Sequence, residues 1–135
     1  MPARPPRLKR RREFQRVAAR GQRAGRPGVA VQVLAVPEAP LRVGFTATKK
    51  IGNAVIRNRC KRRLREAARL LLGDGAVTGH EVVLLAREAT ATRDFRTLLG
   101  DLRGALRQAG LNLPPPPVGE GRGGGTTPGA ESATP

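Results

Sequence analysis

The chain has 135 residues, of which 26 are Lys or Arg and 10 are Asp or Glu, and its formal net charge is +16. A charge of this size favours an anionic partner, either a nucleic acid or a membrane surface. One cysteine excludes a disulfide framework and a cysteine-based zinc site, and one histidine disfavours a multi-histidine metal site. No apolar run reaches the roughly 20 residues of a membrane span, and no apolar stretch follows the basic N-terminus as in a secretory signal. We therefore expect a cytoplasmic protein with no membrane partner.

The first half of the chain predicts one helix and two strands. A short helix is expected from Glu13 to Arg20, ended by Gly21, because apolar residues recur there at helical spacing: Phe14, Val17 and Ala18. Residues 28–36 are β-branched and apolar and predict a strand, whereas residues 41–48 alternate between apolar and polar and predict a half-buried strand. Because a short turn with two prolines joins these strands, we expect them to pair as a hairpin.

The second half predicts a helix, a strand and a helix. A long helix from Ala54 to about Leu72 would begin at an Asn53 N-cap, and a buried strand would span 80–87. Thr90 or Thr92 would cap a last helix, ended by Gly110, whose apolar side carries Phe95, Leu99, Leu102, Leu106 and Ala109. The order αββαβα indicates an α+β fold, a small sheet with packed helices.

The composition divides the chain into one domain and a tail. Residues 1–113 would form a single nucleic-acid-binding domain. Residues 114–135 contain six Pro and six Gly and almost no large apolar side chain. Such a segment cannot bury a core, so we expect a disordered extension.

The positive charge lies in two blocks of the first half. Residues 1–26 and residues 42–69 each hold ten basic residues and one acid, whereas residues 70–113 hold five of each sign. A surface selected only for solubility would mix the two signs more evenly. The clustering therefore predicts two surfaces for an anionic partner.

The helix predicted over 53–72 carries most of the second block. Its expected buried seam is Ile56, Cys60, Leu64, Ala67 and Leu71, which makes Cys60 a core residue. Cations cover most of the remaining surface with Glu66 as the only acid, and neighbours four residues apart repel each other. Phosphates would relieve that repulsion, so we interpret this as a nucleic-acid-binding helix rather than a solvated charged face. Because the helix packs on a sheet and is rich in Arg, RNA is favoured over DNA.

Composition leaves three functions open: a subunit of a ribonucleoprotein enzyme, a structural RNA-binding protein of the ribosomal type, and a DNA-binding architectural protein. No paired carboxylates, Cys–His pair or metal cluster stands out in the sequence, so no catalytic residue and no metal ligand is predicted on this chain. No small-molecule ligand is expected either.

The segment KKIGNAVIRNRCKRRLRE at 49–66 resembles the signature of the protein subunit of bacterial ribonuclease P. Three flanking segments resemble the same family in the same order: RLKRRREFQRV at 7–17, LRVGFTATKK at 41–50 and HEVVLLAR at 80–87. The resemblance implies a fold like the second domain of ribosomal protein S5, with the order αβββαβα and a left-handed βαβ crossover. It therefore implies a small mixed sheet with one short strand more than the pattern places.

The resemblance also implies a function for the chain. As the protein subunit of ribonuclease P, it would bind the catalytic RNA and the 5′ leader of precursor tRNA. It would assist the endonucleolytic cut that gives the mature tRNA 5′ end. The catalytic groups would lie on the RNA subunit with Mg²⁺, and the protein alone would bind no cofactor.

The same resemblance assigns two sets of site residues. The set expected against the catalytic RNA is Lys49, Lys50, Asn53, Arg57, Asn58, Arg59 and Arg62. The set expected at the cleft for the leader is Phe14, Val17, Ala18, Val31, Lys61 and Arg65. At two of the cleft positions, 18 and 31, family members often carry an aromatic residue, so we expect leader binding here to depend more on charge than on base stacking.

Overall fold

A computed structural model describes residues 6–73, 77–111 and 113 of the chain. Its helices and strands follow the order α1 (Arg11–Arg20), β1 (Gln22–Arg26), β2 (Val29–Ala35), β3 (Arg42–Thr46), α2 (Ala54–Leu72), β4 (His80–Ala86) and α3 (Phe95–Gln108), with short 3₁₀ helices η1 (Lys49–Ile51) and η2 (Glu88–Ala91). This is the order αβββαβα. No helix in the described part of the chain has the length and hydropathy needed to cross a membrane. The tail predicted over 114–135 lies outside the described residues.

The four strands form one mixed sheet in the order β1-β2-β4-β3. Strand β2 pairs antiparallel with both β1 and β4, and β3 pairs parallel with β4. The predicted hairpin between 28–36 and 41–48 is therefore wrong, because β4 lies between the two strands. The four apolar residues from Val82 to Leu85 suit a central strand with both faces covered, whereas β3, with Arg42 in it, takes an edge.

The observed hairpin joins β1 to β2. Strand β1 is the short strand that the sequence pattern did not place, and the reason is its composition. Its sequence QRAGR buries only Ala24, so it shows no apolar alternation. As an edge strand, it forms because β2 offers a full row of backbone partners.

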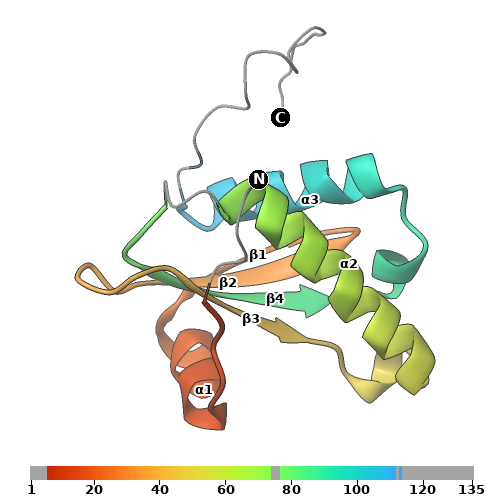
Figure 1. The fold of residues 1–135 in the computed structure, drawn as a ribbon, viewed down its shortest axis with the longest axis horizontal. Helices are drawn as coiled ribbons and strands as arrows, with labels where there is room; N and C mark the ends of the chain where they lie inside the picture. Colours follow the sequence, from red (N-terminus) through yellow and green to blue (C-terminus); the bar gives the residue numbers. More distant parts are fainter. Residues whose placement is uncertain (1–5, 74–76, 112, 114–135) are drawn as a thin grey trace, which may run out of the picture.

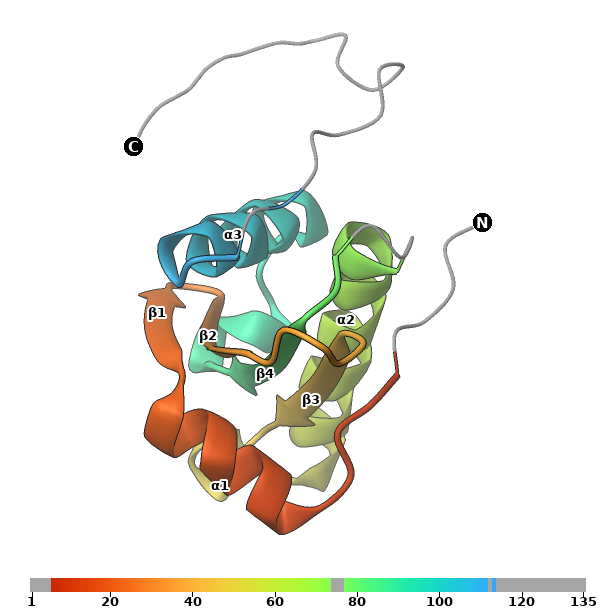
Figure 2. The ribbon, with the colours of Figure 1, turned by 90° about the vertical axis from the view of Figure 1, so that its left-hand side faces the viewer.

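Helices cover the two faces of the sheet unequally (Figures 1 and 2). Helices α2 and α3 lie on one face over the main core, and α1 lies on the other face over a small cluster that includes Leu8, Val17 and Val83. Strands β3 and β4 run from left to right in Figure 1, and Figure 2 shows α2 above the sheet with β4 to the left of β3. The β3-α2-β4 connection is therefore left-handed, against the usual rule.

The ends of the helices show which local predictions hold. Helix α2 has the predicted bounds, and the Asn53 side chain accepts a hydrogen bond from the Ile56 backbone N–H at 3.0 Å. Helix α3 is capped by Asp94, whose carboxylate accepts from the Thr97 N–H at 3.2 Å, so the predicted threonine caps are wrong. Thr90 instead lies in η2 and donates its hydroxyl to the Gly28 carbonyl at 2.6 Å.

Candidate RNA-binding surfaces

The first surface is the solvent side of η1 and α2. Lys49 and Lys50 lie exposed in η1, and four more of the predicted RNA-binding residues are exposed on α2 or at its start: Asn53, Asn58, Arg59 and Arg62. Gly52 joins the two elements with a φ of 156°, and a Cβ there would approach the Ile56 Cβ to 3.0 Å. The glycine thus lets the chain turn sharply from η1 into the helix.

Two arginines of α2 are held against the protein. Arg57 is half-buried, and its Nε is enclosed without a hydrogen-bond partner in the described part of the chain. Arg63 donates to the backbone carbonyls of Ala91, at 3.3 Å, and Arg93. Arg63 therefore marks the side of α2 that faces η2 and the start of α3. The Cα atoms of Lys61 and Arg65, each two residues from Arg63, lie about 160° around the helix axis from that of Arg63. The Arg65 side chain nevertheless lines one pocket together with that of Arg63.

The second surface lies on the α1 side of the sheet. The ring of Phe14 rests on Gly44 of β3, where a Cβ would come within 2.4 Å of a ring carbon. Phe14 and Ala18 are both partly exposed on this side. Three small or apolar residues on the same face are only partly buried and are paired across the sheet: Ala30, Thr46 and Leu85. Of these, Leu85 also packs against the small cluster beneath α1.

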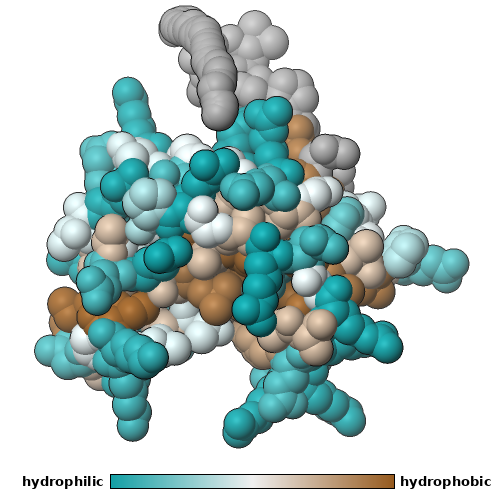
Figure 3. All heavy atoms as spheres, turned by 180° about the vertical axis from the view of Figure 1, so that it is seen from behind, coloured by the Kyte–Doolittle hydropathy of each residue, from teal (hydrophilic) through white to brown (hydrophobic). Residues whose placement is uncertain are grey.

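This part of the sheet lies between α1 and η1. In Figure 1, η1 and the first turn of α2 lie at the level of α1, beyond the ends of β3 and β4. Figure 3 shows a notch at the lower edge of the molecule, flanked by two groups of hydrophilic side chains. The notch lies between the two ends of the molecule that carry α1 and η1.

Two residues predicted for the leader cleft do not line it. Val17 lies on the side of α1 that packs on the sheet and is fully buried. Val31 is 1% exposed, in the core between the sheet and the other two helices. These predictions are wrong because of strand and helix phase. In β2, Val31 shares its face with Val29 and Val33, so Ala30 and Gln32 are the residues on the α1 side. The alternation of residues 29–33 in the sequence indicates this placement of Val31.

Nor does the structure bring the remaining leader residues onto one face. Phe14 and Ala18 belong to α1, whereas Lys61 and Arg65 come from a helix on the opposite face of the sheet. The edge strand β3 and the segment beside it lie between the two groups. Residues Pro6 to Leu8 run parallel to β3, with the Leu8 N–H donating to the Val43 carbonyl at 3.0 Å.

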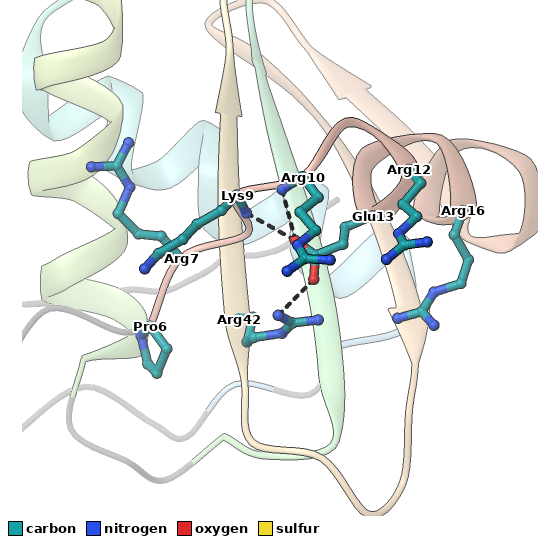
Figure 4. A pocket seen from close by; sticks show the side chains of 8 residues that line it. All are labelled: Pro6, Arg7, Lys9, Arg10, Arg12, Glu13, Arg16 and Arg42. Carbon is teal, nitrogen blue, oxygen red and sulfur yellow. Dashed lines mark hydrogen bonds and ion pairs between the residues drawn. The ribbon is translucent and has the colours of Figure 1, made fainter.

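A third cationic feature, which the sequence showed only as charge density, is a pocket of about 860 Å³ at the start of α1 (Figure 4). Its lining consists of Pro6, Arg7, Lys9, Arg10, Arg12, Glu13, Arg16 and Arg42. Glu13 accepts hydrogen bonds from the backbone N–H groups of Lys9 and Arg10, both at 2.9 Å, and pairs with Arg42 at 2.8 Å. These backbone bonds replace an N-cap side chain, which explains why α1 begins two residues before its predicted start.

A buried carboxylate lies beneath this pocket. Glu81 of β4 is 1% exposed and forms ion pairs of 2.6 Å with both Arg16 of α1 and Arg42 of β3. Burial raises the pKa of Glu81, but the hydrogen bonds from Arg16 and Arg42 outweigh it, so the pKa lies below its usual value. The backbone N–H groups of Arg10 and Lys9, with help from Arg42, lower the pKa of Glu13 to about 2.

The family description of ribonuclease P matches residues 2–110. The chain belongs to the ribonuclease P protein family. The ribonuclease P protein component of Gluconacetobacter diazotrophicus is 49% identical over 78% of this chain and 91% of its own length, and that of Ruegeria pomeroyi is 51% identical over 81% and 88%.

Solved structures give the same family at lower identity. The ribonuclease P protein of Staphylococcus aureus superposes with a TM-score of 0.67 at 25% identity, covering 78% of this chain and 95% of that one. The protein of Thermotoga maritima gives 0.62 at 27% identity, covering 76% and 94%. The resemblance drawn from the motif at 49–66 is thus confirmed, as is the α+β fold with its additional strand.

Membership of the family makes the chain a component of a ribonucleoprotein that processes tRNA. This favours the enzyme-subunit interpretation over a ribosomal-type protein. Among residues 6–73, 77–111 and 113, no three His, Cys, Asp or Glu side chains come together as metal ligands would. The sole cysteine, Cys60, is buried in the seam of α2, where burial raises its pKa.

Proposed function

We propose that this protein binds the catalytic RNA of ribonuclease P through η1 and the solvent side of α2, and the 5′ leader of precursor tRNA through the groove between α1 and η1. The observation that carries the proposal is the cationic side of α2 in a chain of this family. Exposed Lys and Arg side chains there would neutralise RNA phosphates and release counterions.

The two surfaces support different contacts. The α2 surface offers Arg59 and Arg62 with Lys49 and Lys50 just before the helix, a set suited to a folded RNA with closely spaced phosphates. The groove offers Phe14 and a narrow apolar floor, which suits a single strand whose bases are unpaired. Lys61 and Arg65 would contact the strand's phosphates where it leaves the groove past the edge of β3.

In this proposal the chemistry belongs to the RNA subunit, where Mg²⁺ would activate water for attack on the phosphodiester. The described part of this chain offers no ligand cluster for that ion. The protein's own contribution is to hold substrate and catalytic RNA together. Its positive surface lowers the repulsion between two polyanions, so less Mg²⁺ is needed for their association.

The test is reconstitution of the full chain with its cognate catalytic RNA and a precursor tRNA at low Mg²⁺. We expect the RNA alone to cut slowly, the complex to cut faster, and the protein alone to leave the leader in place. Mature tRNA serves as a binding control without a leader. A protein-only activity that survives rigorous purification, or cleavage by the RNA that the protein leaves unchanged, would overturn the proposal.

A further inference from the structure

A pocket of about 520 Å³ lies between the solvent side of α2 and the first turn of α3. Its lining consists of Arg62, Arg63, Arg65, Glu66 and Phe95. The volume is in the range of small-ligand sites, which is about 300–1,000 Å³. The sequence predicts Phe95 as a core residue of the last helix and does not predict it as a contact to RNA.

Two side chains of the pocket are held in place by their neighbours. The guanidinium of Arg63, which donates to the carbonyls of Ala91 and Arg93, lies 5.9 Å from the centroid of the Phe95 ring. Because carbonyls bear no net charge, Arg63 keeps its full positive charge over the aromatic ring. Glu66 accepts two hydrogen bonds from Arg69, at 3.1 and 2.5 Å, which hold its carboxylate beside the pocket.

Phosphate binding alone does not account for this composition. A phosphate gains nothing from an aromatic ring, and a carboxylate beside it repels it. A nucleobase uses both, because its π-face stacks on aromatic rings and guanidinium planes and its amino groups donate to carboxylates. The arginines at the rim then suit the phosphate attached to the same nucleotide.

We propose that this pocket binds one unpaired nucleotide of the catalytic RNA. The base lies against Phe95 and Arg63, an amino group of the base donates to Glu66, and its phosphate contacts Arg62. This inference rests on the proposed function, since it names a feature of the RNA that the α2 surface recognises. The pocket thus adds a contact to a base to the phosphate contacts proposed for the α2 surface.

The chain offers a matched pair of variants. Phe45 of β3 is, like Phe95, partly buried against the main core, and an arginine, Arg7, lies 5.7 Å from its ring centroid. Phe45 is not among the residues that line the pocket. Phe95→Leu and Phe45→Leu therefore remove similar packing, but only the first removes the proposed stacking surface.

The experiment titrates full-length wild type, Phe95→Leu, Phe45→Leu and Arg62→Ala against the cognate catalytic RNA at several salt concentrations. Because Phe95→Leu removes base–aromatic stacking, it should lower the affinity about tenfold. The salt dependence should stay unchanged, because no phosphate contact is removed. Arg62→Ala should lower the slope of log affinity against log salt by about one. Phe45→Leu should bind as wild type does.

Chemical probing of the RNA in the same complexes locates the base. Wild-type protein should protect the Watson–Crick edge of one unpaired nucleotide, and that protection should be lost with Phe95→Leu and with Glu66→Gln while the rest of the footprint stays. If Phe95→Leu and Glu66→Gln both retain the wild-type affinity and footprint, the nucleotide pocket is refuted while RNA binding itself stands. If wild-type protein does not bind the RNA at all, the proposed function fails first.

Discussion

The arginines that hold α1 to the sheet and the arginine that lies over Phe95 have different kinds of partner. On the α1 side, Arg16 and Arg42 are paired with the carboxylates of Glu81 and Glu13. On the α2 side, Arg63 is held by two backbone carbonyls. A carboxylate cancels the charge that it fixes, whereas a carbonyl leaves it to act on a ligand. Arg16 and Arg42 thus attach α1 to the sheet, whereas Arg63 keeps its charge available to a ligand beside α2.

The largest effect is expected from removal of the buried carboxylate. Glu81→Ala leaves two arginines facing each other beneath α1. Removing one partner of a buried pair costs about 3–5 kcal/mol, and partial exposure of both arginines puts the expected loss of unfolding free energy nearer about 3 kcal/mol. Urea unfolding of the full chain measures it. Glu38→Ala, in the exposed turn after β2, is the control and should change stability by no more than about 0.5 kcal/mol.

A second prediction uses pH, because ion pairs titrate and carbonyl contacts do not. The folded-state pKa of Glu13, about 2, lies below the usual 4.5, and that of Glu81 is also lowered. Carboxylates with depressed pKa values stabilise the fold fully above the unfolded pKa and lose that contribution as pH falls through the folded pKa. The free energy of unfolding should therefore be level above about pH 5 and fall between pH 4.5 and pH 2.

The matched variant for this prediction is Glu13→Gln. It should be less stable than wild type at pH 7 and approach wild type as the pH falls toward 2, which urea unfolding across that range measures. A constant difference between the two proteins at every pH would show that the carboxylate stabilises α1 by its shape rather than by its charge.

Local features of the sequence predict the local structure correctly, but they do not predict which strands pair with each other. Asn53 and the seam of α2 fix that helix through contacts within a few residues. The placement of β4 between β2 and β3 depends on partners about 50 and 40 residues away in sequence, which no local pattern records. The pair of Glu81 with Arg16 and the pocket at Phe95 are non-local in the same way. Val31 differs, because the resemblance places it in the cleft, whereas the alternation of residues 29–33 puts it on the core face with Val29 and Val33.

A third prediction is that two arginines of α2 contact different RNAs. Arg59 and Arg65 lie about 120° apart around the helix axis, so one RNA need not contact both. Arg59→Ala should weaken binding of the catalytic RNA, and Arg65→Ala should weaken precursor tRNA more than mature tRNA. Each lost phosphate contact should lower the salt slope by about one and the affinity by about fivefold. Titration of both variants against the three RNAs tests this, and an equal loss for all three would reduce α2 to a general basic patch.

The smallest effect is expected from the C-terminal segment, which lies outside the described residues. Residues 114–135 carry one Arg and two Glu, and the family match ends at residue 110. With so little positive charge and almost no large apolar side chain, the segment should add neither phosphate contacts nor buried area. Deleting it should leave the thermal melting midpoint and the affinity for the catalytic RNA close to those of the full chain, measured side by side under one salt condition. A marked loss of affinity with an unchanged melting midpoint would instead assign the segment an RNA contact, and the charge of the two folded surfaces would no longer account for binding by itself.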